Sequence, residues 1–268
     1  MASNALLRWA GSKRQLVPQL AEYWPGGRTR YVEPFAGSAA LFFHLAPEQA
    51  LLGDLNCDLI ATYRTVRRVP SQVARTLLSM PPADAAFYYS LRGENPSELS
   101  AVHRAARFIY LNRFCFNGLY RTNLQGKFNV PFSGSRNGPL PSAETIQSVA
   151  RILRSVRLIC GDFTQTLRQV RDTDFVYMDP PYWVSNRRVF REYSSTVFDD
   201  THICRLKTWL SRLTARRIAF VLSYAESEQA LALAKGLKIR EVSVKRNIAG
   251  FSASRRRATE LLIVPPYL

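Results

Sequence analysis

The sequence predicts an α/β fold, a central sheet flanked by helices, interrupted by an inserted helical domain. Short apolar runs of strand length recur along the chain, and the first four of them end in polar or glycine-containing turns. A long interval with helical patterning separates the second of these runs from the third. Ligands of α/β proteins bind beyond the carboxyl ends of parallel strands, so we expect the functional residues in these turns.

The expected strands are the apolar runs that end at polar turns. The first four span residues 30–33 (RYVE), 49–52 (QALL), 157–160 (RLIC) and 174–178 (DFVYM). Three further runs span residues 217–223 (RIAFVLS), 239–245 (IREVSVK) and 260–264 (ELLIV). The sheet is therefore expected to draw its strands from both ends of the chain.

The interval between the second and third strands is too long for a simple crossover. It contains a helical pattern over residues 100–113, followed by the turn-rich stretch NGLYRTNLQGKFNVPFSGSRNGP, which predicts a β-hairpin. We therefore expect one domain made of residues 1–58 and 156–268, and a second domain, residues 59–155, inserted into it.

Charge points to a polyanionic partner. The 268 residues include 37 basic and 20 acidic side chains, which gives a net charge of +17 and an isoelectric point near 10.3. Such an excess attracts nucleic acid. The hydrophobic share of 47% is that of an ordinary globular protein and excludes a mostly disordered chain.

The cysteines and histidines do not have the spacing of a metal site. No C-x-x-C pair occurs, and the residues concerned are scattered: Cys57, Cys115, Cys160, Cys204, His44, His103 and His202. We therefore expect no metal and reduced cysteines, as in a cytoplasmic protein. No apolar run reaches membrane-spanning length, and the first residues lack the core of a signal peptide.

The stretch YVEPFAGSAALFF has the composition of a ligand-binding turn. Phe35, Gly37 and Ser38 follow a strand and precede a helical run. Small residues let a ligand approach the backbone, and the first N–H groups of the helix are free to bind it. Asp54 follows the next strand, at a separation that suits hydrogen bonds to ribose hydroxyls. Each acid taken alone is more often a helix cap.

A third acid completes a series at successive strand ends. Asp162 follows the third strand and stands next to Phe163, which offers an acceptor and an apolar wall to a purine ring. The sequence lacks G-x-G-x-x-G and a phosphate-binding loop with lysine. These features favour a nucleoside without pyrophosphate, and S-adenosylmethionine fits that description.

The fourth strand ends in the turn Asp179-Pro180-Pro181-Tyr182. Each proline fixes its φ angle and has no N–H, so the carbonyl groups of Asp179 and Pro180 have no partner within the turn. A stiff turn with a carboxylate, a carbonyl oxygen and a flat aromatic ring suits a planar guest that carries an amino group.

Six motifs in this order closely resemble the Dam-type (D12 class) family of DNA adenine methyltransferases. They are RWAGSK (8–13), YVEPFAGSAALFF (31–43), GDLN (53–56), YLNRFCFNGLYRTNLQGKFNVPF (110–132), GDF (161–163) and DFVYMDPPY (174–182). The resemblance covers most of residues 7–182. The ordered set of motifs, with the long block from Tyr110, is highly specific.

The resemblance implies a Rossmann-like methyltransferase fold that binds S-adenosylmethionine. It implies a catalytic tetrapeptide of Asp179, Pro180, Pro181 and Tyr182, in which Tyr182 stacks on an adenine extruded from the duplex. The residues implied at the cofactor or target pocket are Trp9 and Lys13; those implied around the cofactor are Phe35, Gly37, Ser38, Asp54, Asp162 and Phe163.

The same resemblance implies double-stranded DNA as the partner and target recognition by the insertion. The side chains expected to probe a groove or wedge a base step are Phe116, Asn117, Leu119, Arg121 and Asn123. Gly126 and Pro131 would shape the hairpin, and Arg8 would lie near the first base pair. GATC is the leading expectation for the site, and we expect a monomer or weak dimer.

Two departures leave alternatives open. Ala39 stands where the family usually has a second glycine, and Ser223-Tyr224 replaces a usual Ser-Asn pair. A non-catalytic DNA-binding regulator built on this fold therefore stays an alternative, as does an RNA adenine methyltransferase. Asp179 argues against methylation of the cytosine amino group or of glutamine, because those enzymes usually carry Ser or Asn there.

Overall fold

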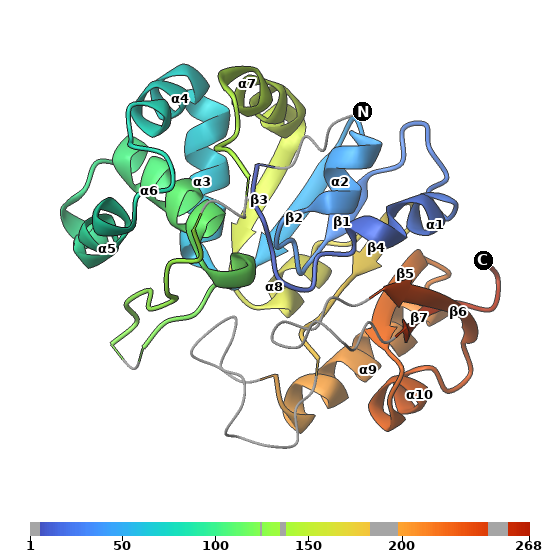
Figure 1. Ribbon diagram of the computed structural model, residues 1–268. Helices are drawn as coiled ribbons and strands as arrows, with labels where there is room; N and C mark the ends of the chain where they lie inside the picture. The colour runs from blue at the N-terminus through green and yellow to red at the C-terminus, as the bar shows by residue number, and fades with distance from the viewer. Residues whose placement is uncertain (1–5, 124, 135–137, 183–197, 246–256) are drawn as a thin grey trace.

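The computed structural model describes residues 6–123, 125–134, 138–182, 198–245 and 257–268. Seven described strands form one sheet in the order β3-β2-β1-β4-β5-β7-β6 (Figure 1). Their bounds are β1 Tyr31–Glu33, β2 Ala50–Asp54, β3 Val156–Cys160, β4 Phe175–Met178, β5 Ala219–Ala225, β6 Lys238–Lys245 and β7 Arg257–Val264. All seven expected strands are present, with starts within three residues of the prediction.

Strand direction divides the sheet into two parts. The strands β3, β2, β1, β4 and β5 run parallel. The last strand, β7, is antiparallel to both β5 and β6, with Ala225 of β5 opposite Glu260. The turns after the first five strands therefore meet at one edge of the sheet, and β7 begins at that edge.

Alternation along the strands produces a separate apolar core on each face of the sheet. Val32 and Val176 belong to the core beneath α8 (Phe163–Leu167), α9 (Asp200–Ala215) and α10 (Glu228–Leu233). Their strand neighbours Tyr31 and Phe175 belong to the core on the opposite face. That second core also includes residues of the remaining helices, α1 Val17–Ala21, α2 Ala40–Leu45, α3 Cys57–Arg68, α4 Pro70–Leu78, α5 Ala85–Gly93, α6 Ala101–Phe114 and α7 Ala143–Ile152.

The helices α3 to α7 lie in the long interval between β2 and β3 and gather beside that end of the sheet, away from α9 and α10 (Figure 1). The expected helix over residues 100–113 is α6, which begins after Ser100. The Ser100 side chain accepts a hydrogen bond from the His103 N–H and caps the helix.

The expected hairpin after α6 is paired less regularly than a strand ladder. Its described residues form two isolated antiparallel bridges, Cys115 with Phe132 and Thr122 with Phe128. The Asn123 side chain accepts hydrogen bonds from the Gln125 and Lys127 N–H groups and so closes the turn. None of the described helices has the length and apolarity to cross a bilayer.

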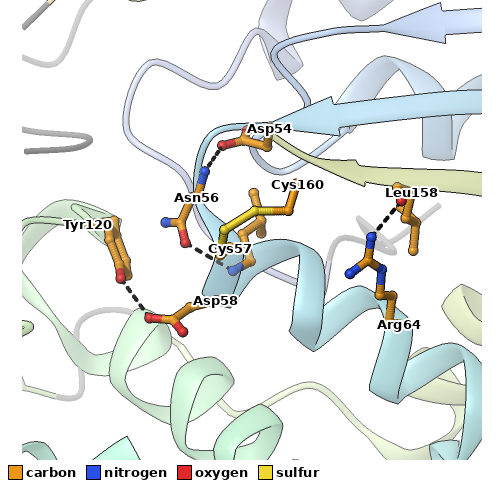
Figure 2. The surroundings of a disulfide bond; sticks show 9 residues. Asp54, Asn56, Cys57, Asp58, Arg64, Tyr120, Leu158 and Cys160 are labelled. Atoms are coloured by element: carbon orange, nitrogen blue, oxygen red, sulfur yellow. Dashed lines mark hydrogen bonds between the residues drawn. A yellow bond between two sulfur atoms is a disulfide. The ribbon is translucent and has the colours of Figure 1, made fainter. Parts of the chain in front are cut away.

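The expectation that all cysteines are reduced is wrong for Cys57 and Cys160, which form a disulfide with a Cα–Cα distance of 5.2 Å. The two residues are 103 positions apart, but neighbouring parallel strands bring them together, since Cys160 ends β3 and Cys57 begins the helix after β2. The disulfide therefore joins the two ends of the long segment between β2 and the end of β3 (Figure 2). Cys115 and Cys204 are free.

We expect Cys57→Ser to lower the free energy of unfolding by about 2–4 kcal/mol under oxidising conditions, since a cross-link across a long segment restricts the unfolded chain. Dithiothreitol should destabilise the wild type by a similar amount and leave the variant unchanged, as measured by urea unfolding. Cys204→Ser, at an exposed free thiol, is the matched control. Equal stability of both variants and the wild type would contradict this cross-link.

Candidate active site

The loops after β1, β2 and β4 lie together at the carboxyl edge of the parallel strands. Asp54 ends β2 and Asp179 directly follows β4, while Gly37 lies in the loop after β1. The Asp54 carboxylate joins two of these loops, because its Oδ2 accepts the Gly37 N–H at 2.8 Å and its Oδ1 accepts the Asn56 N–H at 2.8 Å. Figure 2 shows the second of these bonds. Asp54 thus fixes the turn in which Gly37 lies.

Gly37 and Trp9 are in close contact. A Cβ atom on Gly37 would lie 2.9 Å from the Trp9 ring atoms Cδ1 and Nε1, and the φ of Gly37 is +48°. Only glycine meets both requirements without strain. The Trp9 ring stacks at 6.3 Å on Tyr120, which belongs to the insertion. Trp9 therefore lies between the glycine loop and the insertion.

Ala39, the first departure from the family pattern, has a left-handed backbone conformation with φ 49° and ψ 43°. Glycine adopts this conformation freely, whereas alanine adopts it at a cost of roughly 1–2 kcal/mol. The residue is 1% exposed, and its N–H donates to the Ala36 carbonyl at 2.6 Å. The loop after β1 thus keeps a left-handed backbone conformation at position 39, although alanine replaces the usual glycine.

An aromatic pair and an ion pair border the same edge beyond β1 and β3. Phe35 and Phe163 stack with their ring centroids 5.2 Å apart. Asp162 caps α8 by accepting the Thr164 N–H at 3.0 Å, and it pairs with Arg205 of α9. The Arg205 guanidinium also lies 5.0 Å from the Phe163 ring centroid. Sequence reasoning missed Arg205, because it comes from a distant helix.

A buried ionic cluster surrounds the start of the Asp-Pro-Pro-Tyr turn. The Lys13 ammonium lies 2.9 Å from Asp179 Oδ1, 2.7 Å from the Tyr182 hydroxyl and 3.3 Å from Glu260 Oε1. The Tyr182 hydroxyl lies 3.1 Å from both Glu260 oxygens. Four residues from three parts of the chain therefore share one network. Glu260 lies in an apolar strand, and no motif in the sequence singled it out.

The second departure from the family pattern also touches this cluster. Ser223 Oγ donates to Asp179 Oδ1 at 3.3 Å and lies 3.1 Å from the Tyr177 hydroxyl. Tyr224 packs its ring against that of Tyr182 at 5.4 Å. Both residues of the pair thus contact the Asp-Pro-Pro-Tyr turn: Ser223 contacts the Asp179 carboxylate, and Tyr224 contacts the Tyr182 ring.

Comparison with known proteins decides the family. The model of the D12 class N6 adenine-specific DNA methyltransferases matches residues 9–248. The chain belongs to this family. It is therefore an adenine-specific DNA methyltransferase, and its mixed sheet of seven described strands with an antiparallel β6–β7 pair is consistent with the S-adenosylmethionine-dependent methyltransferase fold. The fold class predicted from the sequence is confirmed.

Relatives cover nearly the whole chain. Type II methyltransferase M1.LlaDCHI of Lactococcus lactis subsp. cremoris is 34% identical over 96% of this chain and 93% of its own. Type II methyltransferase M.MjaIII of Methanocaldococcus jannaschii is 30% identical over the full length of both. The DNA adenine methylase of Escherichia coli K12 is 30% identical over 97% and 94%. A solved precorrin 8W decarboxylase of Methanobacterium thermoautotrophicum aligns with a TM-score of 0.40 and 11% identity over 94% of this chain and 87% of its own, too distant to carry an argument.

In this D12 methyltransferase the RWAGSK segment is anchored to the insertion. The Arg8 N–H donates to the Asn112 Oδ1 at 2.8 Å, and the Asn112 side chain donates back to the Arg8 carbonyl at 2.6 Å. The pKa of Arg113 falls to about 10 through burial and the neighbouring charges of Arg8 and Arg14. Arg8, Arg14 and Arg113 therefore form one group of neighbouring positive charges, and the sequence did not identify Arg113 as a member of it.

The residues expected to read DNA occupy the segment that follows α6. Phe116 is 42% exposed, and Asn117 has a φ of 53°. Arg121 Nε donates to Asn129 Oδ1 at 2.8 Å across the hairpin. The Phe116 N–H donates to the Pro131 carbonyl at 3.0 Å. These contacts form the hairpin itself, and the roles of Leu119, Asn123 and the others toward DNA stay predictions.

Burial and charge set the protonation of the cluster. Burial raises the pKa of Asp179, and the Lys13 ammonium and the Ser223 hydroxyl oppose that rise. Burial likewise raises the pKa of Glu260, again against the effect of Lys13. Burial would lower the pKa of Lys13, but Asp179, Tyr182 and Glu260 together raise it. Burial raises the pKa of Tyr182 to about 12.

The buried carboxyl group of Glu33 interacts electrostatically with both Asp54 and Asp179. It ends β1, is 2% exposed, and accepts the Tyr31 hydroxyl at 3.1 Å. Burial raises its pKa well above 4.5, and the charges of Asp179 and Asp54 raise it further. Asp54, which ends β2, and Asp179, which directly follows β4, are thus both within electrostatic range of one carboxyl group. The described residues contain no group of three or more acidic, histidine or cysteine side chains placed to hold a metal ion.

Replacement of Glu33 by glutamine tests whether burial raises the pKa of this carboxyl group. The folded pKa of Glu33 lies above the unfolded value, so the stability contributed by its protonated form is present below about pH 4.5 and is lost as the pH rises toward the folded pKa. Gln cannot ionise. We expect the unfolding free energy of E33Q, relative to the wild type, to increase from pH 5 to pH 8 by up to about 1.4 kcal/mol per pH unit.

The measurement is urea unfolding at both pH values. Glu48→Gln, at an exposed position, is the control and should give the same difference from wild type at pH 5 and pH 8. An E33Q difference that does not change with pH would mean that Glu33 ionises as readily in the folded protein as in the unfolded chain.

Proposed function

We propose that this methyltransferase transfers a methyl group from S-adenosylmethionine to the 6-amino group of an adenine everted from duplex DNA, at GATC or a related short site. The observation that carries the proposal is the position of Asp179, which directly follows β4, the neighbour of β1 in the sheet. Its carboxylate contacts the Lys13 ammonium, and so does the Tyr182 hydroxyl. The net charge of +17 supports binding to the phosphate backbone.

The residues at the sheet edge fit S-adenosylmethionine by their chemistry. Asp54 uses one lone pair of each oxygen for a backbone N–H, which leaves further lone pairs for ribose hydroxyls. Phe163 and Phe35 offer an aromatic border for an adenine ring, beside the acceptor Asp162. Trp9, Lys13, Gly37 and Ser38 would line the remainder. When bound, this cofactor supplies an electrophilic sulfonium methyl group.

The catalytic turn would prepare the adenine nitrogen for attack. The amino group of adenine is conjugated with its ring and is a poor nucleophile. Asp179 would accept one of its hydrogens and the Pro180 carbonyl the other, which pulls the nitrogen toward tetrahedral geometry and frees its lone pair. The Asp179 carboxylate would then stabilise the positive charge that develops on nitrogen. Pro181 stiffens the turn. As the new N–CH3 bond forms, the S–CH3 bond would break and leave S-adenosylhomocysteine as the product, and the surplus proton of the amino nitrogen would pass to solvent.

Binding of an everted base requires an aromatic surface, which Tyr182 would supply. We assign target recognition to residues 59–155, with Phe116, Asn117, Leu119, Arg121, Asn123 and Pro131 in the hairpin and Arg8 at its base. Support comes from the mutual anchoring of Arg8 and α6 and from the stacking of Trp9 on Tyr120, which connect the insertion to the glycine loop. Action on chromosomal DNA implies a cytoplasmic location, and we expect a monomer or weak dimer.

Asp179→Asn tests the mechanism. Because asparagine keeps the size of the side chain and loses its charge, we expect methyl transfer to fall by at least ~10²-fold, while S-adenosylmethionine and DNA still bind. Transfer is measured with labelled S-adenosylmethionine, and adenine methylation of host DNA is read by sequencing, which also reports the site.

Asp172→Asn, at an aspartate with 74% side-chain exposure, is the matched control and should keep full activity. Undiminished transfer by the Asp179 variant would exclude the proposed role of that carboxylate. A wild type that binds DNA but not S-adenosylmethionine would instead indicate a regulator, and methylation confined to RNA would identify the other alternative.

A further inference from the structure

Glu260 belongs to the ionic cluster but not to any motif of the site. It lies in β7, opposite Ala225 of β5, and is 2% exposed. The three residues that follow it, Leu261 to Ile263, are buried and apolar. A carboxylate at such a position is costly to bury unless it is paired. An apolar side chain at this position would pack as well as Glu260 does. The presence of a carboxylate therefore needs another explanation, which its contacts provide.

Those contacts are directed at the catalytic turn. Glu260 lies 3.3 Å from the Lys13 ammonium and receives the Tyr182 hydroxyl at 3.1 Å. The same ammonium lies 2.9 Å from Asp179 Oδ1. A single ammonium group is therefore divided between two carboxylates, one in the catalytic turn and one two strands away in the sheet order.

This division matters for the reaction assigned to Asp179. An ammonium has three hydrogens to donate, and a carboxylate engaged by an ammonium is a weaker acceptor for a second donor. In the proposed mechanism the incoming adenine amino group needs Asp179 as its acceptor. Lys13 competes with the amino group for that carboxylate unless another partner holds the ammonium.

We propose that Glu260 is a positioning residue that holds the Lys13 ammonium and the Tyr182 hydroxyl, so that Asp179 stays available to accept the target amino group. The inference rests on the function proposed above and concerns the same site. According to this inference, the effect of Glu260 on methyl transfer depends on the charge of its side chain and not on its volume. Without that charge, Asp179 is the carboxylate of this cluster that remains to pair with Lys13.

Two substitutions separate charge from volume. Glu260→Gln keeps the size and an acceptor for Tyr182 but removes the charge, whereas Glu260→Asp keeps the charge on a shorter side chain. We expect E260Q to lower kcat for methyl transfer by about tenfold, with KM for S-adenosylmethionine and Kd for duplex DNA within twofold of wild type. E260D should retain more of the wild-type kcat than E260Q does.

The control is Glu241→Gln, at an exposed glutamate on the adjacent strand β6, facing Leu261. It should leave kcat unchanged. Wild-type kcat in E260Q, or a larger loss in E260D than in E260Q, would overturn the inference, because the second result means that volume decides. If E260Q fails to fold, E260D below one tenth of the wild-type kcat also overturns the inference, and E260D at or above one tenth supports it. A wild type without adenine methylation would instead count against the proposed function itself.

Discussion

One ammonium group connects the parts of this site. Lys13 comes from the N-terminal segment, Asp179 from the end of β4 and Glu260 from β7, and the ammonium contacts both carboxylates and the Tyr182 hydroxyl. Two carboxylates at this edge are tolerable only because a cation lies between them. The Asp-Pro-Pro-Tyr turn, the N-terminal segment and β7 are therefore held in a fixed relation.

The parallel sheet brings the remaining groups to the same place. Because β2, β1 and β4 are neighbours, Asp54 at the end of β2, Gly37 after β1 and Asp179 after β4 lie at one edge, although they are far apart in the chain. Trp9 extends this assembly to the insertion through Tyr120. The disulfide between Cys57 and Cys160 joins the ends of that insertion close to Asp54 (Figure 2). The segment between β2 and β3 is thus connected, through Tyr120 and the disulfide, to the edge at which Asp54, Gly37 and Asp179 lie.

Much of this could be predicted from the sequence because it depends on local patterns. Apolar runs and polar turns predicted the strands, and the rule for parallel strand ends predicted that Asp54, Asp162 and Asp179 follow them. Glu260 and Arg205 were missed, since their contacts depend on the register of β7 and on the packing of α9. The disulfide was missed for the same kind of reason, because only strand order brings its cysteines together. The left-handed conformation of Ala39 is likewise a property of the folded turn.

The central claim is that the carboxylate of Asp179 receives the amino group of the target adenine. It is tested most directly by a crystal structure of the protein with duplex DNA and an unreactive analogue of S-adenosylmethionine. We predict an everted adenine on Tyr182, its amino nitrogen about 2.7–3.2 Å from the Asp179 carboxylate, and the Lys13 ammonium in contact with Glu260. An everted adenine held elsewhere, with Lys13 still paired to Asp179, would contradict the account.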